Sequence, residues 1–152
     1  MLRGGQIPVG LRISELGINA AIVPEVIDIE KGMLGMPTNI QRLGWWRDGM
    51  APMAHSGTIL IAGHYDFATA GLGAFFPLPR ARRGERIHIT TADGVVHTYR
   101  VVTVDSYPKT ALPLTVFDRR GPPRLVLVTC GGRFDSTTKH FLDNIVVTAV
   151  PV

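Results

Sequence analysis

Short runs rich in Val, Ile and Thr recur along the chain, and Gly, Pro or Asp residues bound most of them. This pattern is typical of β-strands, because β-branched side chains pack well on a pleated surface. Seven or more short strands in one domain favour a closed barrel or a sandwich, so the predicted fold class is all-β. The predicted strands are residues 10–16, 20–29 (interrupted by Pro24), 58–62, 86–90, 95–104, 124–129 and 144–150.

The segments between these strands predict tight turns and little helix. Residues 92–94 read Ala-Asp-Gly between two strands, which is typical of a β-hairpin. One or two short helical turns are expected, near residues 40–43 and 72–78. Two longer connections, residues 67–83 and 106–123, interrupt the strands. Connections of this length in a compact domain tend to be functional.

Length and composition indicate one domain. A chain of 152 residues with 45% hydrophobic residues is long enough to bury a core, and 17 Gly and 11 Pro agree with many turns. We expect the domain to span residues 10–152, after a lead-in at residues 1–9. No apolar run approaches the ~18–20 residues of a membrane-spanning helix, and no signal segment precedes the domain.

The excess of positive charge is modest: 13 Arg and 3 Lys against 12 Asp and Glu give a formal net charge of +4. This balance mildly favours acidic partners or an anionic surface, but the cations are scattered along the chain, which favours a solvated basic surface. The densest cluster has no interleaved aromatic residues for base stacking, so nucleic acid is not expected as a partner. That cluster consists of Arg80, Arg82, Arg83 and Arg86.

The only cysteine is Cys130, which excludes an internal disulfide and a Cys-rich zinc site. It follows the apolar run 124–129 and precedes two glycines, where a turn is expected to open the chain to solvent. A second apolar run, 58–62, is followed closely by His64. Two strands that end in Cys and His can bring a nucleophile beside its proton partner.

Such a pair can activate a thiol. The pKa of a free thiol is roughly 8.5, and that of an imidazole is about 6.5. A nearby imidazole can therefore take the proton of the thiol and later give it to a leaving amine. The oxyanion then needs donors, and Arg133, three residues after Cys130, is the candidate cation if the Gly-Gly turn bends the chain back. No metal is expected, because His64 and Asp66 lack a third ligand, and no cofactor is expected.

Each of these signals also has a structural interpretation. A lone Cys at a strand end and a lone His in an apolar run are commonly core residues, and Arg133 is as readily a solvated loop residue. The remaining histidines are interpreted as structural; they are His55, His88, His97 and His140.

Taken together, these residues resemble the sortases, cysteine transpeptidases of Gram-positive cell surfaces. Residues 127–130 resemble the family's Leu-x-Thr-Cys signature, and residues 62–64 resemble its histidine signature. Residues 129–135 and 143–147 look most like class F sortases of high-GC Gram-positive bacteria. Further similarity lies in residues 43–49, in residues 63–66, and in Phe75 and Leu78, so that it spans residues 10–150.

The resemblance implies a closed eight-stranded β-barrel in which His64, Cys130 and an arginine are catalytic. It implies cleavage of a Leu-Pro-x-Thr-Gly-like sorting motif between Thr and Gly, through an acyl-thioester on Cys130. The acyl group of the surface protein would then pass to a cell-wall amine. It also implies an N-terminal membrane anchor ahead of residues 1–9, and a location on the outer cell surface.

One position departs from the family. Many members carry the catalytic arginine in a Tyr-Arg-Asp-Asn-like segment before the last strand, and here that segment reads Phe141, Leu142, Asp143, Asn144. Arg133 is the nearest alternative. The predicted substrate-binding residues are Thr129, Ala62, Ala111, Leu112 and Leu114; Thr129 can also orient the loop or pack in the core.

Two other interpretations remain open from the sequence. One is a different Cys/His enzyme, such as an L,D-transpeptidase or a papain-like peptidase. The other is a non-catalytic basic β-barrel that serves as a binding module. A Ser-His-Gly-Cys run is missing near Cys130, and the order of His before Cys does not match papain-like enzymes.

Overall fold

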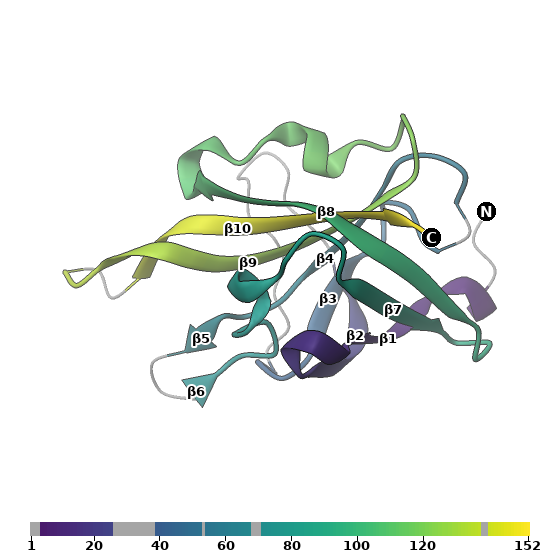
Figure 1. The fold of residues 1–152 in the computed structure, drawn as a ribbon, viewed down its shortest axis with the longest axis horizontal. Helices are drawn as coiled ribbons and strands as arrows, with labels where there is room; N and C mark the ends of the chain where they lie inside the picture. Colours follow the sequence, from purple (N-terminus) through teal and green to yellow (C-terminus); the bar gives the residue numbers. More distant parts are fainter. Residues whose placement is uncertain (1–3, 26–38, 53, 68–70, 138–139) are drawn as a thin grey trace.

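The computed structural model describes residues 4–25, 39–52, 54–67, 71–137 and 140–152. Eight strands close into a barrel in the order β1-β2-β3-β4-β9-β10-β8-β7 (Figure 1), which confirms the predicted fold class. These strands are β1 (Pro8–Ile13), β2 (Ile18–Glu25), β3 (Leu43–Trp46), β4 (Thr58–Ala62), β7 (Arg86–Thr91), β8 (Val96–Pro108), β9 (Arg124–Asp135) and β10 (His140–Pro151). A separate two-stranded sheet pairs β5 (Asp66–Phe67) with β6 (Gly71–Leu72).

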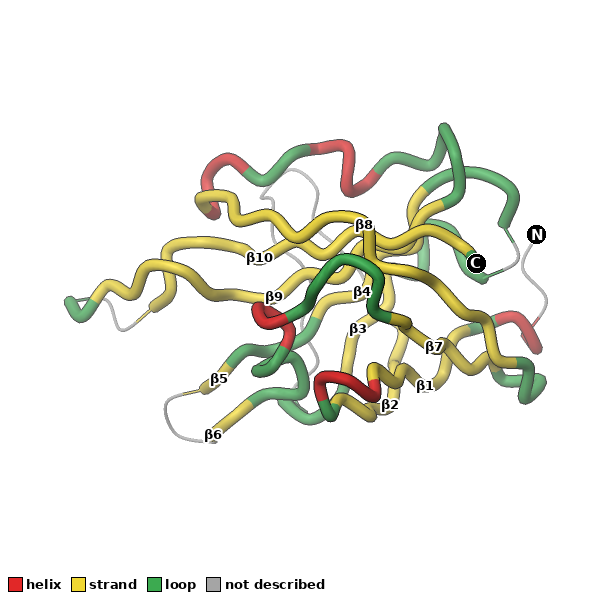
Figure 2. Tube along the Cα trace, viewed as in Figure 1, coloured by secondary structure: helices red, strands yellow, loops and turns green. Residues whose placement is uncertain are grey.

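All the helical segments among the described residues are single turns of 3-10 helix, coloured red in Figure 2. They are η1 (Gly4–Gln6), η2 (Ser14–Leu16), η3 (Leu78–Arg80), η4 (Lys109–Ala111) and η5 (Leu114–Phe117). The expected helical turn at residues 72–78 is therefore displaced, since it follows β6 and becomes η3. The end of the first predicted strand likewise forms η2, and Gly17 closes this turn with a φ of 68°.

The strand prediction for residues 58–62 is confirmed, and the one for residues 86–90 is one residue short of β7. The second predicted strand begins earlier, at Ile18, and ends at Glu25; residues 26–29 of that prediction lie outside the described residues. The predicted β7–β8 hairpin is confirmed, and Gly94 in its turn has a φ of 83°.

Hydrogen bonds within the β7–β8 turn explain its sequence. The hydroxyl of Thr91 donates to a carboxylate oxygen of Asp93 at 2.6 Å, and the amide of Val95 donates to the same oxygen at 3.1 Å. These two hydrogen bonds hold the pKa of Asp93 below its ordinary value, since they stabilise the ionised carboxylate. The turn therefore keeps its acid charged and its backbone satisfied.

The turn expected near residues 40–43 forms just before β3, where the amide of Arg42 donates to the Asn39 carbonyl at 3.1 Å, but it does not continue as a helix. Strand β3 begins at Leu43 and joins β2 to β4. All four residues of β3 are buried: Trp45 faces the barrel interior, and Trp46 packs under η5 on the outside. A short strand buried on both faces shows no alternation of apolar and polar residues, so periodicity could not identify it.

Strand β9 is longer than predicted. The turn expected at Gly131 and Gly132 does not form; β9 continues to Asp135 and pairs with β10, which itself begins at His140. The pairing slips between Phe141 and Asp143, so that two residues of β9 oppose one residue of β10. This is a β-bulge, a feature in which glycine is well tolerated because it has no Cβ.

Two clusters of buried side chains stabilise the barrel. The larger cluster fills the interior, and the smaller one lies outside β4, β9 and β10 beneath η5. In the outer cluster the rings of Trp46 and Phe117 meet edge to face, with centroids 5.4 Å apart and an interplanar angle of 89°. This contact secures the β8–β9 connection, which runs over the barrel in Figure 1.

We predict that Phe117→Ala lowers the free energy of unfolding by about 3 kcal/mol, because a buried aromatic side chain is lost and a cavity remains. Leu114→Ala in the same 3-10 helix is the matched control, since Leu114 is 71% exposed and should change stability by less than about 0.5 kcal/mol. Urea denaturation measures both values. Equal effects would mean that η5 is not packed against the barrel.

Candidate active site

Parallel pairing of β4 with β9 brings the histidine and cysteine segments together. Ala62 lies opposite Val128 in this pair, and the amide of Gly63 extends the ladder by donating to the Val128 carbonyl at 3.1 Å. Two residues beyond the last pair, the backbones of His64 and Cys130 therefore reach the same level of neighbouring chains. The spacing between neighbouring strands is about 5 Å.

Gly63 is fixed on both of its main-chain groups by β9. Its carbonyl accepts a hydrogen bond of 2.9 Å from the buried hydroxyl of Thr129, the residue that precedes Cys130. A side chain at this position would collide with Leu43 and Phe75, so only glycine fits. The backbone on the N-terminal side of His64 is thus attached directly to the strand that carries Cys130.

The C-terminal side of His64 is attached to the core. The His64 carbonyl accepts from the amide of Phe75 at 3.0 Å, and Phe75 is fully buried in the barrel interior. The Tyr65 carbonyl accepts from the amide of Gly73 at 2.9 Å, and a Cβ on Gly73 would overlap the main chain of His64. His64 itself is half-buried. Its segment is therefore held from both sides while part of the residue stays open to solvent.

Cys130 and Arg133 both lie on β9, against β10. Asn144 is the register partner of Cys130, and Asp143 is the partner of Gly131. The β-bulge follows at once, so Gly132 and Arg133 together oppose Leu142. The predicted arginine thus lies directly across from the position where the family often has its arginine.

The predicted substrate-binding residues divide into buried and open positions. Ala62 and Thr129 are only 3% and 1% exposed, so both belong to the interior of the wall. Leu112 is half-buried and packs against the outer cluster. Ala111 and Leu114 are exposed on the β8–β9 connection and are the members of this group that are available to a ligand.

The sequence analysis gave Asp143 no role of its own, although it lies in the segment that resembles the family. Its carboxylate is buried, with 6% exposure, in the β10 position that pairs with Gly131, one residue after Cys130. An acid ahead of the apolar run Ile145-Val146-Val147 was the available signal. Buried carboxylates are rare unless they are bonded, which makes Asp143 a buried polar position beside Cys130 on the neighbouring strand.

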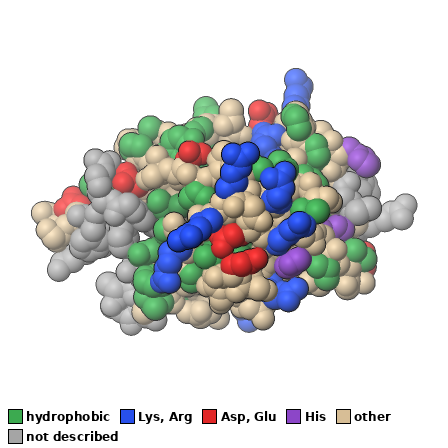
Figure 3. All heavy atoms as spheres, viewed as in Figure 1, with side chains coloured by type: hydrophobic (Ala, Val, Ile, Leu, Met, Phe, Trp, Pro, Cys, Tyr) green, Lys and Arg blue, Asp and Glu red, His purple; other side chains and the backbone are tan. Residues whose placement is uncertain are grey.

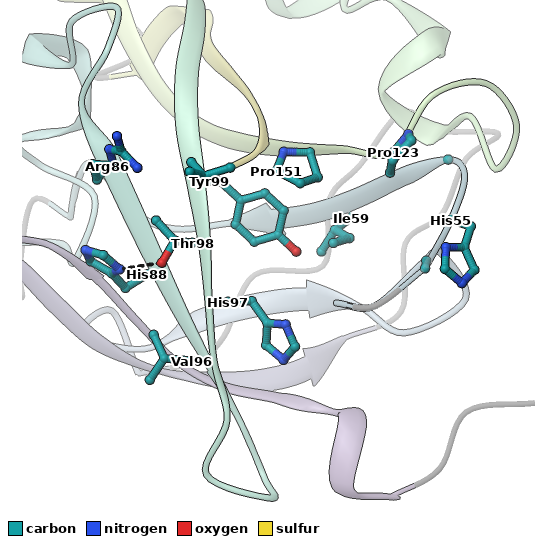
Figure 4. Close-up of a pocket in the computed structure, with 13 residues that line it drawn as sticks. His55, Ile59, Arg86, His88, Val96, His97, Thr98, Tyr99, Pro123 and Pro151 are labelled. Atoms are coloured by element: carbon teal, nitrogen blue, oxygen red, sulfur yellow. Dashed lines mark hydrogen bonds between the residues drawn. The ribbon is translucent and has the colours of Figure 1, made fainter.

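A hollow with a volume of about 820 Å³ lies near the start of β4 and the end of β10 (Figure 4), and His64 is not among the residues that line it. His97 and Tyr99 lie on one side of β8, while His88 lies on the other side and hydrogen-bonds Thr98 at 3.1 Å. Burial raises the pKa of Tyr99 to about 12. In the described part of the chain, no group of three His, Cys, Asp or Glu side chains could hold a metal ion.

The family model of the sortase domain matches residues 11–152. The chain therefore belongs to the sortase family, whose members are cysteine transpeptidases. The search of curated proteins found no match.

Solved sortase structures have the same fold. Sortase A from Corynebacterium diphtheriae aligns with a TM-score of 0.70 and 20% identity, over 96% of this chain and 60% of that one. Clostridium perfringens sortase D5 transpeptidase aligns with a TM-score of 0.70 and 18% identity, over 100% of this chain and 82% of that one. Sortase C-1 from Actinomyces oris aligns with a TM-score of 0.70 and 18% identity, over 95% of this chain and 74% of that one. This chain thus spans only part of those proteins, and its resemblance to class F stays a prediction.

Sortases act at the cell surface, so an extracytoplasmic location fits the family. Among the residues that the structure describes, no helix is long and apolar enough to cross a bilayer.

We predict that Thr129→Val lowers the free energy of unfolding by about 1–3 kcal/mol, because the buried Gly63 carbonyl loses its donor. It should also slow alkylation of Cys130 at neutral pH, since the His64 segment is no longer tied to β9. Thr129→Ser, which keeps the hydroxyl, should restore the alkylation rate. Urea denaturation and mass spectrometry of the alkylated protein measure the two effects. Unchanged values in the valine variant would show that this hydrogen bond does not position the site.

Proposed function

We propose that this chain catalyses transpeptidation through Cys130, with His64 as its proton partner. The observation that carries the proposal is the alignment of the two residues at the ends of the parallel β4–β9 pair, fixed by the hydrogen bonds of Gly63 to Val128 and Thr129. The membership of the chain in the sortase family supports it.

The reaction would proceed in two acyl transfers. The Cys130 thiolate attacks the carbonyl carbon of the threonine in the sorting motif, and the resulting oxyanion collapses to a thioester as the peptide amine leaves. The His64 imidazolium gives its proton to that amine. An incoming amine then attacks the thioester, His64 takes its proton, and the thiolate is released. Atoms and charge balance without any cofactor.

Arg133 is proposed as the cation that stabilises the oxyanion. It follows Cys130 by three residues and opposes Leu142 across the β-bulge, so it can act where the family's arginine would otherwise be expected. A cation at a developing oxyanion is worth several kcal/mol when water is excluded. Hydrogen bonds from backbone amides would add to it.

The proposed substrate is a Leu-Pro-x-Thr-Gly-like sorting signal, and the proposed acceptor is a cell-wall amine. The exposed Ala111 and Leu114 would contact the apolar residues of the motif from the β8–β9 connection, with Leu112, Ala62 and Thr129 supporting the wall behind them. The enzyme would work outside the membrane, attached through an N-terminal anchor, in the manner of a class F sortase.

The decisive test is mass spectrometry of the protein with a Leu-Pro-x-Thr-Gly peptide and an excess of a glycine or alanine amine. We expect a threonine-terminated product joined to the amine, and an acyl-enzyme at Cys130 when the amine is withheld. Cys130→Ala and His64→Ala should abolish both. Cleavage without transfer would instead indicate a hydrolytic Cys/His enzyme, and a folded but inactive protein that still binds a ligand would favour the binding module.

The role of Arg133 is tested by moving the arginine across the bulge. Arg133→Ala should lower kcat by roughly 100-fold to 1,000-fold, the cost of losing one oxyanion donor. Adding Leu142→Arg to the Arg133→Ala variant should recover much of that loss, because it again places one arginine beside the thiol. Leu142→Gln is the matched control and should recover nothing. If Arg133→Ala is fully active, the oxyanion is stabilised without this side chain.

A further inference from the structure

The fold concentrates the positive charge of the chain on one face. Six exposed arginines and two glutamates gather around β1, β7 and β8 and the two 3-10 turns η2 and η3, and together they carry a net charge of +4, which equals that of the whole chain. Figure 3 shows Lys and Arg side chains grouped around acidic ones on the face in view. The residues of this basic face are Arg12, Arg80, Arg82, Arg83, Arg86, Arg100, Glu15 and Glu85.

Strand register explains the clustering. Arg86 lies directly opposite Arg100 in the β7–β8 pair, and Arg12 lies opposite His88 in the β1–β7 pair. Their neighbours in sequence, such as Leu11 and Ile87, are buried inside the barrel, so alternation directs these side chains outward. Arginines from three separate segments thus meet on one sheet surface.

Within the described parts of the chain, no acidic side chain forms an ion pair with the arginines of these strands. The ion pair that the structure shows among the described residues joins Arg124 to Asp118, which lies elsewhere. Like charges directly opposite each other on neighbouring strands destabilise a sheet, so the pair Arg86–Arg100 costs stability in the isolated protein. Glu85 is also engaged locally, because its carboxylate accepts a hydrogen bond from the Arg82 amide. An external anion would offset this repulsion.

Exposed valines adjoin the basic face at the β7–β8 hairpin. Val95 and Val96 are 48% and 52% exposed, and Val9 on the neighbouring strand β1 is 40% exposed. Val96 pairs with Thr90, and the next row on the same face of the sheet contains Arg12, His88 and Thr98. Neither of these two rows contains a Phe, Tyr or Trp. Cations beside a small apolar edge match the phosphates and the acyl boundary of a lipid bilayer, whereas a soluble polyanion gains nothing from the valines.

We propose that the outer face of β1, β7 and β8 binds an anionic lipid bilayer. Arg12, Arg86 and Arg100 contact headgroup phosphates, and Val95 and Val96 enter the interface. In the barrel order, β1 and β7 lie half a turn from β4 and β9, and β10 separates β8 from β9, so docking leaves the strands of the active site uncovered. This surface acts independently of the proposed transpeptidation and would hold the barrel in a fixed orientation.

Flotation with lipid vesicles tests the proposal. The protein should float with phosphatidylcholine vesicles that contain phosphatidylglycerol and should not float with phosphatidylcholine alone. Arg12→Gln/Arg86→Gln/Arg100→Gln should weaken binding on the order of 100-fold, since each basic residue near an anionic surface adds to the affinity. Raising the salt concentration should weaken the wild-type protein in the same direction.

A second triple variant, Arg47→Gln/Arg119→Gln/Arg120→Gln, is the matched control. These arginines are also exposed and their loss changes the net charge equally, but they lie outside the basic face, so binding should stay close to that of the wild type. Equal losses in the two triple variants would overturn the proposal, because they would mean that only the net charge matters. Circular dichroism of each variant shows that the barrel is folded.

The valines separate a bilayer from a soluble polyanion. Val95→Ser/Val96→Ser should weaken vesicle binding and leave binding of inorganic polyphosphate unchanged. If the protein binds polyphosphate through Arg12, Arg86 and Arg100 but ignores vesicles, the face recognises a soluble polymer and the bilayer proposal is wrong. If it binds neither, the face is only a solvated basic surface and the proposal is likewise overturned.

Discussion

The parallel pairing of β4 with β9 is the constraint on which the candidate site depends. Parallel strands end at the same edge of a sheet, so whatever follows one strand lies beside whatever follows the other. Here Gly63 continues that pairing beyond β4, with its amide bonded to Val128 and its carbonyl bonded to Thr129. The chain between the two strands is the crossover that this geometry requires, and it contains β7, β8 and the connection that carries η4 and η5.

Much of the fold could be predicted from the sequence because β-branched runs and turn residues act locally. Residues 58–62 form β4 as predicted, and the Ala-Asp-Gly turn forms its hairpin. Strand β3 could not be predicted, because its few residues are buried on both faces and carry no alternation. The extension of β9 was missed for a different reason: two glycines are compatible with a turn and with a bulge, and only the presence of β10 alongside decides between them.

In the candidate site, too, local features could be predicted from the sequence and long-range contacts could not. The apolar runs that lead to His64 and Cys130 are local features that the sequence alone shows, although β9 continues past Cys130 to Asp135. The hydrogen bond from Thr129 to Gly63 joins residues 66 apart, and no pattern in either segment announces it. The clustering of the basic face was hidden likewise, since Arg12 and Arg100 are remote from the arginine-rich segment until strand pairing brings them beside Arg86. The long-range pairing register of the strands is therefore what could not be predicted from the sequence.

The β-bulge between β9 and β10 bears on how a missing arginine can be replaced. The backbones at Leu142 on β10 and at Arg133 on β9 are about one strand spacing apart, roughly 5 Å. An extended arginine side chain is longer than that distance, and its planar guanidinium offers donors in several directions. The bulge also increases the local twist and redirects the chain after Cys130. Under the role proposed for Arg133, the guanidinium would reach the same oxyanion from the neighbouring strand, and the chemistry would depend on where the guanidinium lies rather than on its place in the sequence.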